Sequence, residues 1–466
     1  MNFKLITHSA TILSDTLTPV SIYLRLRDKY PNSLLLESSD YRANDNSFSF
    51  ICCNPIASIR VSNEILTRKY PDGSEDSVTI EAGMDIPQAI EDFSGTFQTD
   101  SGDAHKFPHN GLFGYMAYDA VRYFENIEVS KKDGLLNIPD IYYAVYKNVI
   151  AINHFNNTTH LFAHCYQSEN NLPELLQLLR SRNFSAFHFA REGKQGSNIS
   201  DEEFKLLVAK CKTHCGRGDV FQIVPSKRFT QKFTGDDFNV YRALRSVNPS
   251  PYLFYFDYGN FRIFGSSPEA QLVVQGDQAE IHPIAGTFKR TGNDRQDAEM
   301  AKSLSEDPKE NSEHVMLVDL ARNDLSRNGT NVKVAKYREI QFFSHVIHLV
   351  SKVTAKINPR VSTMRIVADT FPAGTLSGAP KHRAMQLLES YELQSREFYG
   401  GAIGFMDFKG NFNHAIIIRS FLSKNHCLHY QAGAGIVSDS DVNKELEEVY
   451  NKLKALTSAM ELAETI

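Results

Sequence analysis

The sequence predicts an α+β protein with mostly antiparallel sheets and surrounding helices. Two apolar runs, Tyr252–Tyr258 and Phe261–Phe264, are separated by Gly259-Asn260, a typical tight hairpin turn. A second pair of runs, 402–408 and 413–422, flanks a Lys-Gly-Asn turn. Strands that hairpins connect pair antiparallel, and helical patterns are interspersed with these hairpins. The two observations together define the fold class.

Strands also dominate the first part of the chain. Short β-prone runs occur at 33–37, 47–52 and 56–61, and a longer one covers Ile141–Ile152. A helix is predicted at Pro173–Arg182. The N-terminal part is therefore expected to contribute mainly strands.

A polar segment, Arg191–Ser200, has two glycines and no hydrophobic periodicity. We interpret it as a surface connection that divides the chain into an N-terminal region, 1–192, and a larger region, 193–466. Ser200 and Glu203 have the spacing of a capping box, which predicts that a helix opens the second region.

The second region alternates between helices and strands. Helices are predicted at 238–247, 363–370 and 382–390, and a last helix from residue 442 onward. The apolar run Ile340–Val350 is compatible with either a helix or a strand.

The composition is that of an ordinary globular protein. The chain has 466 residues, of which 42% are hydrophobic and 23% charged, and its formal net charge is −5. It lacks the basic surplus that is typical of nucleic-acid binding. It has no apolar run of about 20 residues, and its N-terminus lacks the pattern of a signal peptide. The six cysteines are not spaced as zinc ligands, so we expect reduced thiols in a soluble, cytoplasmic protein.

Two pairs of carboxylates are candidate metal ligands. Glu310 and Glu313 are three residues apart, as are Glu445 and Glu448, so each pair lies on one face of its predicted helix. Oxygen ligands of this kind suit a hard divalent cation that keeps open positions for water and an anionic substrate. The alternative is that both pairs belong to ordinary solvated helix faces.

Two loops of small residues are candidate anion sites. Gly433 and Gly435 follow a predicted strand, where glycine lets backbone N–H groups approach a carboxylate or phosphate. Lys452 lies four residues after Glu448 on the same helix face and could neutralise a second anionic group. The loop Gly374–Lys381 leads into a helix, and is either an anion site at the helix N-terminus or a tight packing loop.

Three single residues are candidates for catalysis or binding. Glu269 follows a strand and could act as a general acid if it is shielded from water; a solvated turn residue is the alternative. His348 lies among apolar residues, a pattern that favours a core histidine. Arg419 ends the apolar run Ile416–Ile418 and is expected to face an anion, because burying an unpaired arginine is costly.

Long motifs in the second region resemble the chorismate-utilising enzymes. These motifs are FQIVPS (221–226), SSPE (266–269), HPIAGT (282–287), EHVMLVDLARNDL (313–325), HLVS (348–351), FPAGTLSGAPK (371–381), YGGAIG (399–404), IIIRS (416–420) and GAGIVSDSD (433–441). They span essentially all of residues 200–455. The resemblance implies the chorismate-binding enzyme fold.

The resemblance also implies roles for the candidate residues. Mg²⁺ would bridge Glu313 and Glu448 to the ring carboxylate of chorismate, and Glu310 and Glu445 would adjust the charge one layer further out. The other implied roles are Glu269 as the acid for the departing 4-hydroxyl, His348 in the elimination of pyruvate, Thr375 as a further catalytic residue, Tyr399 and Arg419 on the enolpyruvyl carboxylate, and Gly433, Gly435 and Lys452 on the ring carboxylate.

Two positions divide this family by nucleophile. Isochorismate and salicylate synthases carry a water-activating lysine where this chain has Gln222, and aminodeoxychorismate synthases typically carry a nucleophilic lysine where it has Ala285. Added ammonia is what remains, which would make this a magnesium-dependent lyase that forms anthranilate and pyruvate for tryptophan biosynthesis. Aminodeoxychorismate formation in the folate pathway and a non-catalytic chorismate or tryptophan sensor are the alternatives.

The resemblance further implies a protein partner. None of the six cysteines lies in the Gly-x-Cys-x-Gly setting of a glutamine amidotransferase. Ammonia is therefore expected from a separate amidotransferase subunit, in a hetero-oligomer.

Feedback inhibition by L-tryptophan is the last implied property. The segments Leu35–Ser38 and 248–252 resemble the two parts of a tryptophan site in this family, which would make the N-terminal region regulatory. The expected inhibitor-binding residues are Glu37, Ser38, Asn248, Pro249, Ser250 and Tyr252. The chain has no tryptophan, which fits an enzyme that is needed when tryptophan is scarce.

Overall fold

The computed structural model describes residues 2–38, 47–100, 107–130, 132, 136–181, 183–342 and 346–466. The helices within these ranges are α1 (Pro19–Leu26), α2 (Ile86–Gly95), the 3-10 helix η1 (Tyr118–Tyr123), α3 (Leu172–Arg180), α4 (Asp201–Arg217), α5 (Phe238–Val247), α6 (Asp294–Glu306), α7 (Pro308–Ser326), α8 (Thr363–Thr370), α9 (Gly374–Ser377), α10 (Lys381–Tyr391) and α11 (Val442–Ala463).

The strands within the same ranges are β1 (Phe3–Leu13), β2 (Leu34–Glu37), β3 (Phe48–Ser62), β4 (Ile65–Lys69), β5 (Glu75–Thr79), β6 (Phe97–Thr99), β7 (Leu112–Met116), β8 (Ile141–Asn153), β9 (Thr158–Cys165), β10 (Phe189–Ser197), β11 (Gln222–Ile223), β12 (Ser226–Gly235), β13 (Tyr252–Asp257), β14 (Arg262–Ser267), β15 (Ala270–Gln275), β16 (Gln278–Ile281), β17 (Ile284–Lys289), β18 (Gly329–Phe342), β19 (Val346–Ile357), β20 (Gly378–Ala379), β21 (Ala402–Met406), β22 (Phe412–Ile416), β23 (Ser420–Lys424) and β24 (Cys427–Gly433).

Antiparallel pairing joins most of these strands, so the predicted fold class is confirmed. One path of hydrogen-bonded neighbours runs β10-β12-β24-β23-β14-β13-β2-β3-β8-β7-β21-β22-β15-β16-β19-β18. Both predicted hairpins are present, as β13–β14 and β21–β22. The pairing of β1 with β6 is parallel.

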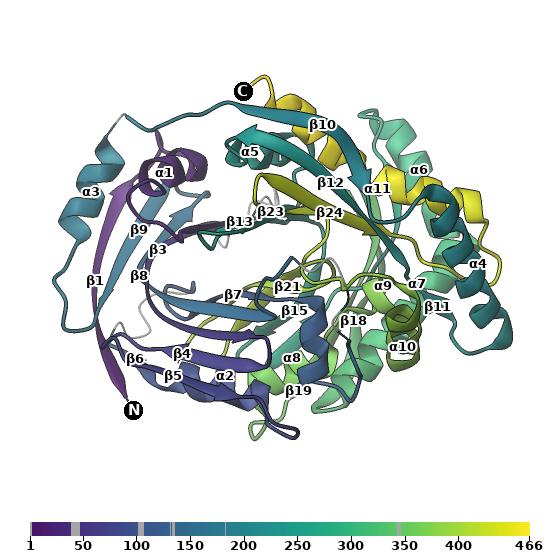
Figure 1. Ribbon diagram of the computed structural model, residues 1–466, viewed down its shortest axis with the longest axis horizontal. Helices are drawn as coiled ribbons and strands as arrows, with labels where there is room; N and C mark the ends of the chain where they lie inside the picture. Colours follow the sequence, from purple (N-terminus) through teal and green to yellow (C-terminus); the bar gives the residue numbers. More distant parts are fainter. Residues whose placement is uncertain are drawn as a thin grey trace.

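The strands form two layers between helices (Figure 1). An inner apolar core lies between the layers and includes Phe254 and Leu422 on one side and Phe113 and Ile403 on the other. A second core lies beneath α1, α3, α4, α5 and α11, and a third beneath α2, α7 and α8. Burial of both faces of each sheet explains the nearly continuous apolar runs of β13 and β14 in the sequence.

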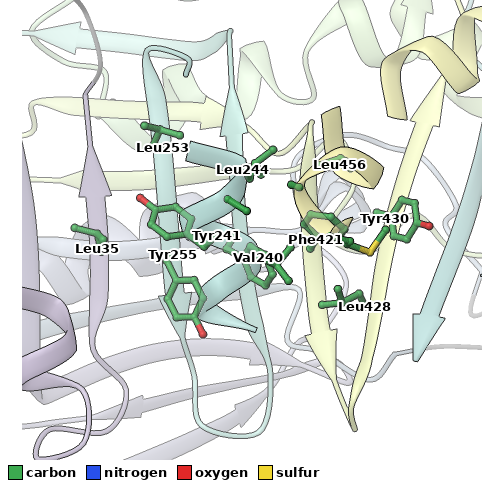
Figure 2. Close-up of a cluster of buried hydrophobic side chains, with 14 of the residues drawn as sticks. Leu35, Val240, Tyr241, Leu244, Leu253, Tyr255, Phe421, Leu428, Tyr430 and Leu456 are labelled. Carbon is green, nitrogen blue, oxygen red and sulfur yellow. The ribbon is translucent and has the colours of Figure 1, made fainter. Parts of the chain in front are cut away.

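Residues far apart in the chain share the core beneath α5 and α11 (Figure 2). Leu35 comes from β2, Tyr255 from β13, Tyr241 from α5 and Leu456 from α11. All four are at most 2% exposed. The N-terminal strand β2 is therefore an integral part of the sheet that the C-terminal helix covers.

Local signals located most helices to within a few residues. Ser200 and Glu203 form the predicted capping box at the start of α4. The helix predicted at 238–247 is α5, and it ends before Asn248-Pro249, where proline disfavours a helical conformation of the preceding residue. The two carboxylate pairs lie on α7 and α11.

The segment Arg191–Ser200 is not the irregular connection that we predicted. Phe189–Ser197 is strand β10, which pairs antiparallel with β12 with a register shift between Glu192 and Gly196. Most of its side chains are exposed, so the strand needs no apolar residues and its backbone pairing leaves no hydrophobic alternation in the sequence. The boundary at 192/193 falls inside this strand, and the division of the chain there stays a prediction.

The ambiguous run Ile340–Val350 is β-structure. It covers the end of β18 and the start of β19, and residues 343–345 lie outside the described residues. The six cysteines are free thiols, as predicted. Among the helices that the structure describes, none is both long and apolar enough to cross a membrane.

Candidate active site

The first carboxylate helix faces the glycine loop that follows β24. Gln222 donates from Nε2 to Glu313 Oε1 over 2.8 Å. A Cβ atom added to Gly435 would lie 2.6 Å from Gln222 Nε2 and 3.7 Å from Glu313 Oε1. The Glu313 carboxylate and the Gln222 amide thus lie next to the backbone of Gly435.

The second carboxylate helix meets the same loop through a lysine. Lys452 donates from Nζ to the carbonyl oxygen of Gly433 over 2.8 Å, and its Nζ lies 2.6 Å from Glu448 Oε1. Glu448 and Lys452 are one turn apart on α11 and share a helix face, as their spacing predicted. α7 and α11 therefore bring Glu313 and Glu448 to the two ends of one short Gly-Ala-Gly segment.

Gly433 is held close to a neighbouring strand. It pairs with Ser226 in the β12–β24 ladder, and an added Cβ atom would lie 2.6 Å from the carbonyl oxygen of Pro225. Such a distance excludes any larger residue without backbone movement. The backbone of Gly433 also hydrogen-bonds the hydroxyl of Tyr399, a site residue that is 4% exposed.

Glu310 and Glu445 lie one turn before the two carboxylates. An added Cβ atom on Gly286 would be 3.0 Å from Glu310 Oε2, so Glu310 packs against the backbone of β17. Glu445 is 3% exposed. Neither side chain is an ordinary solvated one.

Glu269 is partly buried and bonded to a second predicted residue. Thr375 in α9 donates from Oγ1 to Glu269 Oε1 over 3.0 Å. Burial raises the pKa of Glu269 to about 8, although the bond from Thr375 and the charges of Lys452 and Arg419 oppose this increase. Because desolvation outweighs those effects, the carboxyl group holds its proton at neutral pH, as a general acid must.

Arg419 lies in the connection between β22 and β23 with a left-handed backbone, φ +50°. Its carbonyl oxygen accepts from the Ser266 backbone N–H over 3.1 Å, which fixes this conformation. Burial lowers the pKa of Arg419, and Tyr399, Glu269 and Glu448 counter that effect. A backbone of this kind is costly in a non-glycine residue and persists because surrounding contacts hold it.

His348 in β19 is 4% exposed and its Nδ1 is 3.0 Å from the carbonyl oxygen of Gly286. Burial lowers its pKa to about 4, so the ring is neutral at physiological pH. A neutral ring whose Nδ1–H donates to that carbonyl carries its lone pair on Nε2. Both the core position and a role in proton transfer fit this environment.

The loop Gly374–Lys381 does not present its lysine as an anion ligand. Lys381 Nζ donates to Asp324 Oδ2 over 2.6 Å and to the Thr370 carbonyl oxygen over 2.9 Å, so it joins α10 to α7. The site residue in this loop is Thr375. Of the two alternatives for this loop, the contacts of Lys381 favour a packing role for that residue.

Two supporting residues escaped the sequence analysis. Gln222 was considered only as the replacement of a lysine, and its bond to Glu313 was not foreseen. Arg396, which is 2% exposed, lies three residues before Tyr399 and binds the backbone on either side of the site. A charged residue in an otherwise buried motif was the available signal.

The two segments predicted to bind an inhibitor are neighbours in space. β2 and β13 pair antiparallel, with Glu37 opposite Leu253. A cavity of about 510 Å³ beside them is lined by residues of both segments and by aromatic side chains. Its lining residues include Glu37, Ser38, Pro251, Tyr252, Phe50 and Phe405.

The polar residues of that region already have partners. Glu37 accepts from Tyr241 Oη over 2.6 Å and from Arg245 Nε over 2.9 Å. Asn248, Pro249 and Ser250 do not line the cavity. Asn248 instead bonds Ser266, the residue that pairs with Leu253 in the β13–β14 ladder. The roles of these residues stay predictions.

The fold and the site together define a chorismate-binding enzyme. The model of the chorismate binding enzyme family matches residues 31–458, and the chain belongs to that family. Within it, the chain is 36% identical to the anthranilate synthase component 1 of Lactococcus lactis, over 96% of this chain and 98% of that protein. It is also 36% identical to the anthranilate synthase component 1 of Aquifex aeolicus, over 99% and 96% of the two chains.

Solved structures agree with this assignment. The structure of anthranilate synthase component I from Streptococcus pneumoniae superposes with a TM-score of 0.77 at 30% identity, covering 96% of this chain and 98% of that one. The menaquinone-specific isochorismate synthase of Escherichia coli superposes with a TM-score of 0.73 at 16% identity, over 98% and 95% of the two chains. The second likeness concerns the fold alone.

The bond from Thr375 to Glu269 leads to a prediction about pH. If Glu269 is the general acid, its protonated form is the active one, and kcat/KM should fall as pH rises through about 8. The Thr375 hydroxyl stabilises the ionised form, so Thr375→Val should raise the pKa of Glu269 and move the alkaline limb of the profile to higher pH. The profile is to be measured at a constant concentration of unprotonated ammonia.

Glu269→Gln serves as the reference for this prediction, because it removes the titrating group and should abolish activity. An alkaline limb that stays in place, or moves to lower pH, in Thr375→Val would show that Glu269 is not the acid.

Proposed function

We propose that this chain is component I of an anthranilate synthase, which converts chorismate and ammonia to anthranilate and pyruvate in the cytoplasm. Membership of the chorismate binding enzyme family and the names of its full-length relatives support this proposal. The observation that carries it is the bond from Thr375 to Glu269, a carboxyl group that burial and the nearby charges of Lys452 and Arg419 leave with a pKa of about 8.

The substrate carries two carboxylates, and the site supplies cations for both. Arg419 and Tyr399 bind the enolpyruvyl carboxylate, while Lys452 and the backbone of Gly433 and Gly435 bind the ring carboxylate. Fixing the ring at two charged ends sets its 4-hydroxyl against Glu269. Positioning of this kind contributes several kcal/mol, roughly 7–11 in the best-oriented reactions.

The reaction then needs several proton transfers. Glu269 donates its proton to the departing 4-hydroxyl, which leaves as water as ammonia adds to the ring, and the added nitrogen gives up a proton in turn. We propose that the neutral imidazole of His348 takes the ring proton at the aminated carbon. The C–O bond to the enolpyruvyl group then breaks and its methylene carbon gains a proton, which releases pyruvate and restores aromaticity. Thr375 stabilises the carboxylate that Glu269 becomes.

Gln222 supports ammonia over water as the nucleophile. Its amide is bonded to Glu313 and is uncharged over the whole physiological range, so it cannot deprotonate a water molecule. A lysine at position 222 would place an ammonium group beside Glu313, where it would compete with a bound metal ion. The neutral amide of Gln222 does not compete in this way. Added ammonia needs no activating base because the unprotonated form is already a nucleophile.

An assay with chorismate, Mg²⁺ and an ammonium salt tests the proposed function. Product identified as anthranilate by mass and fluorescence is the expected result, with pyruvate formed in equal amount. Isochorismate or aminodeoxychorismate as the main product would overturn the proposal, and so would chorismate binding without turnover.

We further propose that Glu313 and Glu448 hold Mg²⁺ together with the substrate. Within the described residues no three His, Cys, Asp or Glu side chains form a metal centre by themselves. Two carboxylates flanking the Gly-Ala-Gly segment nevertheless offer the oxygen donors that Mg²⁺ takes, and it commonly completes its shell with substrate and water. When bound, the metal would neutralise the ring carboxylate.

Replacement of these ligands gives the metal prediction. Glu313→Gln and Glu448→Gln should abolish turnover with the fold intact, and should weaken Mg²⁺ binding by roughly 10–100-fold or more. Calorimetric titration with Mg²⁺ measures the binding directly. Glu447→Gln is the matched control, because Glu447 is exposed on α11 beside Glu448. Wild-type activity of both ligand variants at limiting Mg²⁺ would refute the assignment.

We propose that glutamine-derived ammonia comes from a separate amidotransferase subunit. The purified chain should turn over with ammonium salts and not with glutamine. Glutamine-dependent activity of this chain alone would contradict the proposed partner.

We also propose that the cavity beside β2 and β13 binds L-tryptophan as an inhibitor. Its aromatic walls suit an indole ring, and Glu37 and Ser38 supply polar groups at one end. A short route joins the cavity to the active site. Glu37, Leu253 and Ser266 lie in one register row of β2, β13 and β14, and the Ser266 N–H donates to the Arg419 carbonyl oxygen.

Inhibition through that route would appear as a higher apparent KM for chorismate in the presence of L-tryptophan. Ser38→Ala, and Pro249→Ala in the loop that carries Asn248, should relieve it with little loss of activity, whereas Ser130→Ala at a distant exposed site should not. Because coupling is reciprocal, saturating chorismate should weaken tryptophan binding by the same factor. Equal calorimetric affinities for tryptophan with and without chorismate would rule the coupling out.

A further inference from the structure

Arg396 hydrogen-bonds the backbone next to several site residues. Its Nη1 donates to the carbonyl oxygen of Leu376 and its Nη2 to that of Val224, both over 2.6 Å. Leu376 follows Thr375 in α9, and Val224 lies two residues after Gln222. One guanidinium therefore ties the backbone that carries the partner of Glu269 to the backbone that carries the partner of Glu313.

The counter-ion of Arg396 extends the same network to the glycine loop. Glu392 accepts from Arg396 Nε over 2.7 Å and from Nη2 over 2.8 Å. Glu392 Oε1 also accepts from the backbone N–H and hydroxyl of Ser226, which is the residue paired with Gly433. The ion pair thus fixes the strand against which the Gly433 backbone lies.

The guanidinium is held between two aromatic rings. Its central carbon lies 4.7 Å from the ring centroid of Tyr118 and 5.8 Å from that of Tyr399. Burial opposes its charge, but Glu392 raises the pKa of Arg396 above its ordinary value, so the group stays charged. A planar guanidinium can satisfy two carbonyl oxygens and both carboxylate oxygens at once, which a lysine ammonium cannot.

We propose that Arg396 is a positioning residue for the reaction, which sets the hydroxyl of Thr375 against Glu269 and the ring of Tyr399 against the substrate. Arg396 acts through these residues and not on the reacting atoms. This inference rests on the proposed function for its kinetic test only, because the Thr375–Glu269 bond can also be followed without turnover.

Arg396→Lys keeps the positive charge beside Glu392 but removes the planar set of N–H donors of the guanidinium. Freed carbonyl oxygens at Leu376 and Val224 should let α9 shift, and displacements near 1 Å at a reacting group cost up to about 100-fold. We expect kcat to fall roughly 10- to 100-fold. The alkaline limb of kcat/KM should move to higher pH, as in Thr375→Val, because Glu269 loses the same bond.

Arg27→Lys is the matched control. Arg27 is also largely buried, binds both carboxylate oxygens of Asp236 and packs on the ring of Phe238, but it lies away from the site in the connection after α1. The two lysine variants should lose comparable thermal stability, and the control should keep the wild-type kcat and pH profile. This separates positioning from a general loss of stability.

The double variant Arg396→Lys/Thr375→Val tests whether Arg396 acts through Thr375. If it does, the shift of the alkaline limb in the double variant should equal that of Thr375→Val alone. Independent, additive shifts would overturn the proposal, as would a wild-type kcat and alkaline limb in Arg396→Lys. Should Arg396→Lys not fold, Glu392→Gln removes the opposing charge and should shift the limb in the same direction; an unchanged limb there also overturns the proposal.

The protonation of Glu269 can be followed without catalysis. Its folded-state pKa lies above the ordinary value of 4.5, so the stability it contributes is present below about pH 4.5 and is lost as pH rises through about 8. The free energy of unfolding of the wild type minus that of Glu269→Gln, both measured in urea, should decrease as pH rises through this window. In an Arg396→Lys background the upper end of the window should move to higher pH, whether or not the chain makes anthranilate.

Discussion

The close approach of the Gly-Ala-Gly segment to residues 222–226 is the constraint on which the rest of the site depends. Gly433 pairs with Ser226, and a side chain on Gly433 would collide with the Pro225 carbonyl oxygen. That contact leaves the glycine backbone in reach of Lys452 from α11 and of Gln222 from β11. Two helices from different parts of the chain thereby offer their carboxylates to one short loop.

Desolvation is the stronger of two opposing electrostatic effects at Glu269. Lys452, Arg419 and Thr375 all favour the ionised carboxylate, yet burial raises its pKa to about 8. The same burial lowers the pKa of Arg419 and makes its charge depend on nearby anions. For the dianion that we propose as substrate, this arrangement supplies an acid that already holds a proton and a buried arginine whose charge an incoming carboxylate would stabilise.

Much of the fold could be predicted because its signals are local. The capping box of Ser200 and Glu203, the turn at Gly259-Asn260 and the proline after Asn248 each fix their conformation within a few residues. The strand β10 could not be predicted, because its exposed polar residues depend on pairing with β12, and pairing over that separation leaves no pattern in either segment.

The candidate site likewise contains features that local spacing predicted and features that it could not predict. Spacing alone placed Glu310 with Glu313 and Glu448 with Lys452, since one helical turn relates each pair. Long-range contacts such as Gln222 with Glu313, or Arg396 with the Leu376 carbonyl oxygen, follow from packing that no short window encodes. The roles of the site residues were predicted from the resemblance to the family. Residues that act through backbone carbonyl oxygens were missed, because such hydrogen bonds involve no second side chain that a sequence motif could reveal.

One sheet joins the proposed inhibitor cavity to the candidate active site. β2 comes from the start of the chain, yet it pairs with β13 and shares a core with α5 and α11. If the cavity beside β2 and β13 holds L-tryptophan, as we propose, the ligand contacts a strand whose other neighbour, β14, bonds the backbone of Arg419. Because interiors are close-packed, a shift of β13 is expected to reach β14. We propose that this strand order couples the cavity to Arg419.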